Sequence, residues 1–208
     1  MIKRDNSIKF FSLKKERHIR DGIIIDDLLT LINKRVQNTN FTPKGHELYL
    51  EQQVIKSFKK NKQIESFVGK FRELVVVNLE SCNIPHYVEN YEAISLPKKE
   101  FFLDEDCFYS TLFHELTHFT RNKIREGIDK YIRVENGTML SELEESIAEI
   151  GSLILNVNFG TMNSHTLMHH VEYLFFELRN LEQKERKQVL KKAILEANKA
   201  VKWLMEYK

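Results

Sequence analysis

The sequence is poor in cysteine, glycine and proline, and each shortage excludes a class of architecture. Its two cysteines, Cys82 and Cys107, are far apart and form no CxxC pair, which excludes a thiolate zinc site and a disulfide framework. We expect both to be ordinary buried thiols. The seven glycines and three prolines leave few places for a flexible linker, and the chain contains no repeats or low-complexity tracts.

The chain also lacks long apolar runs and a large excess of one charge. Its longest apolar stretches, such as Leu74 to Val77, are far too short for a membrane span or a secretory signal, so we expect a cytoplasmic protein without a membrane partner. The 32 basic and 30 acidic residues nearly balance, which excludes recruitment of nucleic acid by overall charge. The first twenty residues are locally basic. We expect a solvated arm there, and contact with the phosphates of a nucleic acid is the alternative.

Apolar residues spaced by three and four predict helices over most of the chain. After Pro85 the pattern changes, and short strands are expected at His86 to Val88 and at Glu92 to Leu96. A further helical pattern runs from Ile64 to Leu79, although its segment from Leu74 to Val77 could instead be a strand. The predicted helices cover residues 24–36, 47–58, 105–120, 142–155, 167–178 and 190–204, and Asn136-Gly137 is expected to close a hairpin.

These elements predict a mostly helical α+β fold with a small β-sheet. With 208 residues and 42% hydrophobic content, the chain can bury a substantial core. We divide it where the pattern changes. Residues 1–83 are expected to form an N-terminal helical region of unclear role, and residues 84–208 the functional domain.

The helix expected at 105–120 carries the pattern HELTH at residues 114–118. His114 and His118 are four residues apart, so their rings project from one face of the helix and can share one metal ion. Glu115 lies roughly 100° round the helix, between that face and an apolar stripe, so it can face metal-bound water without binding the metal. This placement predicts a zinc site in which Glu115 is the general base.

A five-residue pattern is weak support by itself, and a catalytic zinc site needs a third ligand. The second helix, expected from about Glu142 to Leu155, supplies one, because Glu145 can complete a His-His-Glu set. Glu149, one helical turn further along, can accept the outward ring N–H of a ligand histidine, for which we expect His114. Three small residues would let the two helices approach closely: Ala148, Gly151 and Ser152.

Other acidic residues near Glu145 are explained by a helix end. Ser141, with Glu144 three residues later, forms a capping box, which predicts that the second helix begins there. Asp104 is the expected N-cap of the first helix. We therefore expect Glu142 and Glu144 to face solvent rather than the metal.

Two stretches carry a resemblance to a known family: residues 108–120, FYSTLFHELTHFT, and residues 144–151, EESIAEIG. They resemble the zincin-like metallopeptidase domain of ArdC-type antirestriction proteins, which plasmids, phages and related mobile elements carry. The segments Tyr91 to Pro97 and Ala193 to Val201 extend the resemblance, so it covers about Ile84 to Leu204.

The resemblance implies a zincin-like fold with an HExxH helix and a glutamate helix, the same three metal ligands and the same catalytic Glu115. The order of helices is also similar to that of thermolysin-like zincins, in which a strand edge above the cleft holds the substrate backbone. We assign that role to Glu92 to Leu96. In the family a domain that binds single-stranded DNA usually precedes this one, and residues 1–83 do not carry its pattern.

Peptidases of this kind often need a further donor to stabilise the oxyanion, commonly a His or Tyr beyond the glutamate helix. His165, His169 and Tyr173 lie at four-residue intervals on the polar face of the helix predicted at 167–178, and they are our candidates. An ordinary row of histidines at the edge of the core is the alternative.

The sequence therefore predicts a zinc-dependent metallopeptidase with one Zn²⁺ per chain that acts on a protein or peptide substrate. The resemblance implies that a mobile element encodes it and that host defence is its target. The alternative is a non-catalytic antirestriction factor that binds DNA or protein through a zinc-stabilised fold. A purely structural zinc is disfavoured, because a glutamate base beside two histidines indicates an open catalytic site.

Overall fold

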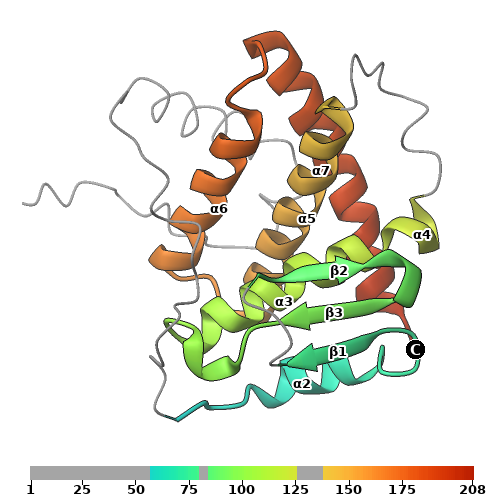
Figure 1. Cartoon of the computed structure of the whole chain (residues 1–208), viewed down its shortest axis with the longest axis vertical. Coiled ribbons are helices and arrows are strands. Elements are labelled where there is room, and N and C mark those ends of the chain that lie inside the picture. Colours follow the sequence, from blue (N-terminus) through green and yellow to red (C-terminus); the bar gives the residue numbers. More distant parts are fainter. Residues whose placement is uncertain (1–56, 80–83, 126–137) are drawn as a thin grey trace, which may run out of the picture.

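The computed structural model of the protein describes residues 57–79, 84–125 and 138–208, without the side chains of 79, 138–140 and 164–165. Figure 1 shows a small sheet at one end of the molecule and long helices that extend away from it. The elements in chain order are α2 (Lys62–Gly69), β1 (Val76–Leu79), β2 (His86–Val88), a 3-10 turn (Glu89–Tyr91), β3 (Ala93–Leu96), a second 3-10 turn (Lys99–Phe101), α3 (Glu105–Phe119), α4 (Arg121–Ile124), α5 (Thr138–Phe159), α6 (Ser164–Leu178) and α7 (Gln183–Glu206).

This architecture confirms the predicted mostly helical α+β fold with a small β-sheet. Several predicted features lie wholly or almost wholly outside the described residues, namely the helices at 24–36 and 47–58, the hairpin around Asn136, and Cys82. Cys107 is a buried free thiol, as predicted. Among the helices that the structure describes, none combines the length and the apolar character needed to cross a membrane.

The strands form one mixed sheet in the order β1-β3-β2. β1 runs parallel to β3, with Val76 opposite Ala93. β2 runs antiparallel to β3 on its other side, with His86 opposite Ser95. The segment that could be a strand or a helix end is therefore a strand, and it begins at Val76. β3 begins one residue later than predicted, because Glu92 adopts φ 44°, in the left-handed region, at the end of the preceding turn.

Residues before position 84 belong to the same core as those after it. Asn61 caps α2 by accepting hydrogen bonds from the backbone N–H groups of Gln63 and Ile64. The buried Phe67 ring lies 6.2 Å from that of Phe113 in α3. β1 likewise pairs with β3 across the predicted division of the chain. The assignment of residues 1–83 to a separate region stays a prediction, because most of them lie outside the described part.

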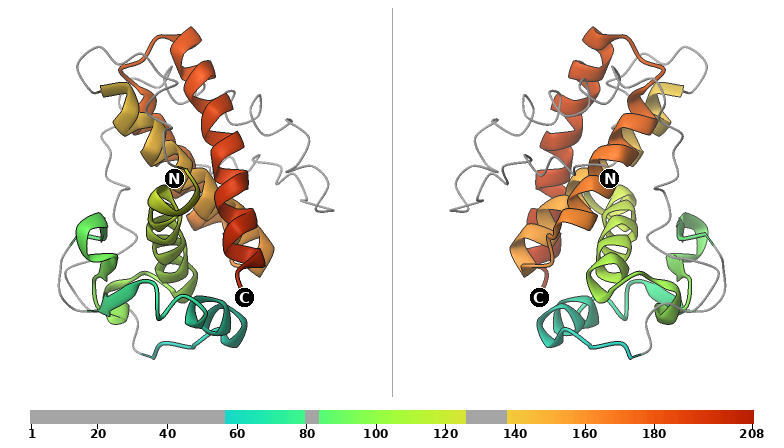
Figure 2. Two further views of the ribbon diagram at one scale, coloured as in Figure 1. Left: turned by 90° about the vertical axis from the view of Figure 1, so that its right-hand side faces the viewer. Right: turned by 90° about the vertical axis from the view of Figure 1, so that its left-hand side faces the viewer.

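α3 carries the HELTH pattern and forms where the sequence predicts it. Its N-cap is Asp104, whose Oδ1 accepts the backbone N–H of Cys107 at 2.7 Å. Figure 2 shows α3 between the sheet and the later helices α5 and α7. The apolar stripe of α3 is buried, and none of its members is more than 4% exposed: Phe108, Leu112, Leu116 and Phe119.

α5 begins earlier than predicted. It starts at Thr138, so Ser141 lies inside the helix and the predicted capping box is wrong. The carboxylate of Glu144, which would have to bond back to the backbone of Ser141, contacts His118 and Arg125 instead. Glu142 and Glu144 are only 5% and 8% exposed, so the prediction that both face solvent is also wrong.

The close approach of α3 and α5 depends on the small residues of α5. A Cβ atom at Gly151 would lie 2.6 Å from Cγ2 and Oγ1 of Thr117, a distance that real Cβ contacts do not show. Ala148 and Ser152 are fully buried beside it. The predicted close contact is therefore present, and it brings the carboxylates of α5 opposite the histidines of α3.

Candidate metal centre

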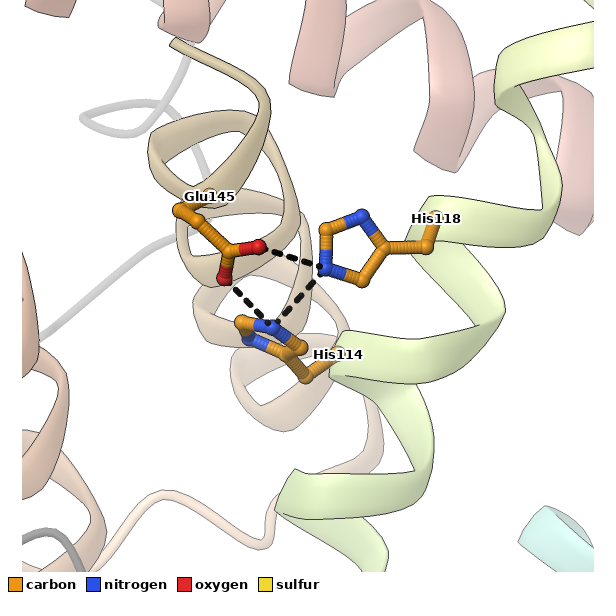
Figure 3. Close-up of side chains that lie close together, drawn as sticks. All are labelled: His114, His118 and Glu145. Carbon is orange, nitrogen blue, oxygen red and sulfur yellow. Dashed lines mark hydrogen bonds and ion pairs between the residues drawn. The ribbon is translucent and has the colours of Figure 1, made fainter. Parts of the chain in front are cut away.

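The side chains of His114, His118 and Glu145 converge between α3 and α5, as Figure 3 shows. His114 Nε2 lies 3.1 Å from His118 Nε2 and 3.4 Å from Glu145 Oε2. His118 Nε2 lies 3.6 Å from Glu145 Oε1. In a tetrahedral site with metal–ligand bonds of about 2.0–2.2 Å, neighbouring ligand atoms are roughly 3.4 Å apart, so these three side chains fit one zinc ion.

The charge on Glu145 also suits a cation site. Burial acts to raise the pKa of this carboxyl, but hydrogen bonds from His114 and His118 hold the pKa well below its usual range. Glu145 is therefore an anion at neutral pH. One carboxylate and two imidazoles form a common ligand set of catalytic zinc sites.

Glu149 lies directly behind His114. Its Oε2 is 2.8 Å from His114 Nδ1, and its side chain is only 2% exposed. Burial acts to raise the pKa of Glu149, but interactions with His170 and His114 hold the pKa well below its usual value. An ionised carboxylate can only accept hydrogen bonds, so His114 Nδ1 carries a proton, and Nε2, which faces His118 and Glu145, is the nitrogen that would give its lone pair to a metal ion.

Glu144 occupies the corresponding place behind His118, a role that the sequence reasoning missed. Its Oε1 is 3.1 Å from His118 Nδ1. Arg125 holds both carboxylate oxygens, with Nη1 donating to Oε2 at 2.6 Å and Nη2 donating to Oε1 at 2.8 Å. Burial acts to raise the pKa of Glu144, but the hydrogen bonds from His118 and Arg125 lower it to about 2.

A general rule could have predicted an acceptor behind His118. A metal-binding histidine almost always donates its second ring N–H to a carboxylate, a carbonyl or water. Glu149 was assigned to His114, which left His118 without an acceptor, and Glu144 is the neighbouring acidic residue on α5. The capping box offered a competing explanation for Glu144. No sequence pattern pointed to Arg125, because this residue follows the α4 turn and does not lie on a helix face.

His170 is a second residue that the sequence reasoning missed. It is 1% exposed, and its Nδ1 lies 2.6 Å from Glu149 Oε1. Its position in the sequence indicates a buried side chain, because His170 lies three residues after Leu167 and four before Leu174, on the apolar stripe of α6. A histidine on a buried stripe needs polar partners inside the protein.

Of the three candidates for a further donor, Tyr173 reaches the ligand cluster. Its hydroxyl donates to Glu145 Oε2 at 2.9 Å. His169 Nδ1 lies 3.8 Å from Glu149 Oε1, beyond hydrogen-bond distance. The side chain of His165 lies outside the described residues.

Glu115 borders a cleft made of two adjoining cavities of about 290 and 210 Å³. Its side chain is 4% exposed, and burial raises its pKa. His114 and Tyr173 also border both cavities. The first cavity extends towards Glu89 and Arg121, and the second towards Ile84 and His169.

The strand beside this cleft is β2, so the prediction that Glu92 to Leu96 holds the substrate backbone is wrong. β3 is the central strand of the sheet, and its backbone pairs with β1 on one side and β2 on the other. It therefore has no free edge. β2 is an edge strand of the described sheet, and Pro85, His86 and Tyr87 line the first cavity.

Tyr109 has a packing role in the structure. Tyr109 is on the α3 helix but away from the metal cluster, and its hydroxyl donates to Glu65 Oε1 at 3.0 Å. Its ring packs against Phe58 and Phe108, with ring centroids 5.7 and 5.3 Å away.

Comparisons with known proteins find similarity in sequence and in fold. The sequence pattern of the family described as MPTase-PolyVal, zincin-like metallopeptidase, matches residues 62–196. A metal-free crystal structure of the antirestriction protein ArdC from plasmid R388 is similar over 76% of this chain, with 21% identity and a TM-score of 0.53. The Mn(II)-bound structure of ArdC is similar over 75% of this chain, with 24% identity and a TM-score of 0.52.

These similarities have a limited extent. The aligned part covers 53% and 54% of the two ArdC chains, so this chain spans about half of ArdC. No protein of curated function matches this chain. The family match begins at residue 62, before β1, and therefore includes the whole described sheet.

Proposed function

The chain belongs to the zincin-like metallopeptidase family, and we propose that it hydrolyses peptide bonds in a protein or peptide substrate. The observation that carries this proposal is the position of Glu115, a buried carboxylate at the cleft beside three converging ligand side chains. A purely structural metal site would not require a base at that position.

His114, His118 and Glu145 would hold the metal ion in this proposal. Zinc is the ion that we propose, because two imidazole nitrogens and one carboxylate oxygen form a common catalytic zinc set. Bound there, zinc would polarise the scissile carbonyl and lower the pKa of a water molecule to roughly 7. The Mn(II) in the ArdC structure makes manganese the first alternative to test.

Glu115 would act as the proton carrier. Burial raises the pKa of Glu115 towards neutral pH, which suits a general base. It would accept a proton from the attacking water, whose oxygen forms the new bond to the carbonyl carbon. Glu115 would then deliver that proton to the amide nitrogen as the C–N bond breaks.

Two further groups of the cleft would bind the substrate. The outer edge of β2, with which no strand among the described residues pairs, would form backbone hydrogen bonds to an extended peptide, which is how sheet edges commonly bind peptides. The Tyr173 hydroxyl, which lies at the ligand cluster, would donate a hydrogen bond to the carbonyl oxygen as negative charge develops on it. Burial raises the pKa of Tyr173, so this hydroxyl stays protonated.

The similarity to ArdC favours a second candidate, a non-catalytic antirestriction factor in which the metal stabilises the fold. In that case the partner would be a host defence protein or DNA. The charge of the whole chain gives no support for DNA binding, and only the basic first twenty residues would supply phosphate contacts.

Glu115→Gln separates the two candidates. With purified full-length protein loaded with zinc, we expect hydrolysis of a peptide library to fall by at least about 100-fold, because the proton carrier is lost. Zinc stoichiometry and thermal stability should stay unchanged. Chelation should abolish hydrolysis, and re-addition of zinc or manganese identifies the working ion.

Equal hydrolysis by the wild type and Glu115→Gln would overturn the peptidase proposal. So would an antirestriction activity in cells that survives Glu115→Gln while no peptide is cleaved.

A further inference from the structure

We propose that His170 is a positioning residue of the metal centre: through Glu149, it fixes His114 in the tautomer and orientation that present Nε2 to the ion. This inference rests on the proposed role of His114 as a ligand. It does not depend on which substrate, if any, is hydrolysed.

The two oxygens of Glu149 are shared between two histidines from different helices. Oε2 lies 2.8 Å from His114 Nδ1 of α3, and Oε1 lies 2.6 Å from His170 Nδ1 of α6. Both distances are those of strong hydrogen bonds to a charged acceptor. Because an ionised carboxylate has no proton to donate, both Nδ1 atoms must carry one.

The opposite nitrogen of His170 faces hydrogen-bond donors. Its Nε2 lies 3.2 Å from Ser110 Oγ and 3.2 Å from Asn156 Nδ2. Thr161 sets the orientation of the Asn156 amide, because the Thr161 hydroxyl donates to Asn156 Oδ1 at 2.7 Å. The amide nitrogen of Asn156 therefore faces Ser110 Oγ, Ser152 Oγ and His170 Nε2 as a donor, and His170 Nε2 accepts from it or from the Ser110 hydroxyl.

A continuous chain of hydrogen bonds results. It runs from Thr161 through Asn156 and His170 to Glu149, and from there to His114. All of its links except His114 are at most 3% exposed, so water does not compete with them. In this arrangement His170 Nδ1 donates to Glu149 Oε1 and holds the carboxylate in the position from which it accepts from His114.

A second metal ion would be the other use for Glu149, His169 and His170, whose ligand atoms lie within 4.8 Å of one another. The distances decide against it. Glu149 Oε1 is 2.6 Å from His170 Nδ1 and 3.8 Å from His169 Nδ1, whereas ligand atoms around a tetrahedral zinc are roughly 3.4 Å apart. The shorter distance is that of a hydrogen bond and is too short for two separate ligands of one zinc ion, so Glu149 and His170 bind each other rather than a shared ion.

The test compares two substitutions at one position. His170→Leu removes the donor to Glu149, and His170→Asn retains an N–H group near the place of Nδ1. Zinc affinity is measured on the full-length chain by competition with a chromophoric chelator. We expect affinity to fall roughly 10- to 100-fold for His170→Leu, as for other residues that orient metal ligands, and His170→Asn to recover most of it.

His169→Gln is the matched control, because His169 is the next residue on the same helix and lies beyond hydrogen-bond distance from Glu149. It should bind zinc with unchanged affinity. Wild-type affinity in His170→Leu would overturn the proposal. Two bound zinc ions in the wild type, with one lost in His170→Leu, would also overturn it and would indicate the second metal site.

A measurement on the wild type keeps the proposal testable if His170→Leu does not fold. Long-range ¹H–¹⁵N NMR spectra of the histidine rings report which nitrogen is protonated. With zinc bound, we expect a protonated Nδ1 and a bare Nε2 at His170. A proton on Nε2 with a bare Nδ1 would contradict the proposal. Neither readout uses hydrolysis, so failure here is distinguishable from failure of the peptidase proposal.

Discussion

The two histidines of the candidate metal centre are supported from behind in different ways. His118 donates to Glu144, and the guanidinium of Arg125 holds both oxygens of that carboxylate. His114 donates to Glu149, which has no arginine or lysine among the partners described for it and is held by His170. One carboxylate is held by an arginine and the other by the ring N–H groups of two histidines.

The supports of His118 and His114 also come from different parts of the fold. The support of His118 comes from α5 and from Arg125, only a few residues after α3. The support of His114 requires α5 and α6 together, because His170 lies on α6. We therefore expect the His118 side to respond mainly to changes of charge, and the His114 side to the docking and donor geometry of α6.

The largest effect should follow removal of the charge on the His118 side. Arg125 is 2% exposed, so Arg125→Met would leave Glu144 ionised and buried without its cation. We expect the free energy of unfolding to fall by about 3–5 kcal/mol, as for other broken buried ion pairs. Urea denaturation of the metal-free protein, followed by circular dichroism, measures the change.

The double variant Arg125→Met/Glu144→Gln is the control for this charge effect. Removing both charges should be less harmful than removing the cation alone, because no uncompensated carboxylate remains in the interior. If the double variant were less stable than Arg125→Met, the lost stability would come from packing of the arginine rather than from its charge.

Spacing along two helices was enough to predict which side chains meet at the centre. His114 and His118 share a face of α3 because they are four residues apart, and Glu145 and Glu149 share a face of α5 for the same reason. The small Gly151 indicated that the two helices could approach. Periodicity within a helix therefore carried the prediction as far as the ligands and one supporting carboxylate.

The rest of the site depends on contacts that periodicity does not encode. Arg125 reaches Glu144 from an irregular segment, so no helical spacing links the two. The choice of β2 rather than β3 as the strand at the cleft depends on strand order in the sheet. Both segments have similar local patterns, and β1, from before the predicted division, covers the second edge of β3.

The supports of His114 and His118 both depend on the contact between α3 and α5, and a substitution at Gly151 tests this shared dependence. A Cβ at Gly151 would lie 2.6 Å from the side chain of Thr117, so Gly151→Ala should force α3 and α5 apart. We expect a loss of about 1–3 kcal/mol in unfolding free energy, typical of overpacked cores, with weaker zinc binding in the same variant. Denaturation and chelator competition measure the two effects.

Gly69→Ala is the matched control for that substitution. A Cβ at Gly69 would find its nearest neighbour, Arg72 Nε, 4.0 Å away, which is ordinary contact. The helical Gly69 should therefore accept alanine with unchanged or slightly higher stability. Equal losses in both variants would show that the effect of Gly151→Ala does not arise at the contact between α3 and α5.

The smallest expected effect is a pH dependence of the free energy of unfolding, which isolates the contribution of the ion pair between Glu144 and Arg125. The pKa of Glu144 is about 2 in the folded protein, against a usual value of 4.5. A lowered folded pKa contributes stability that is present above the usual value and is lost as the pH falls towards the folded value. Between pH 6 and 4, the wild type should lose up to about 1 kcal/mol through Glu144, and Glu144→Gln should lack this component.

Urea denaturation of both metal-free proteins at several pH values measures this component as a difference. The stability difference between the wild type and Glu144→Gln should narrow as the pH falls. A difference that stays constant from pH 6 to 4 would mean that Glu144 has an ordinary pKa. The Arg125 pair would then not keep the carboxylate ionised, and the contrast between the two histidine supports would disappear.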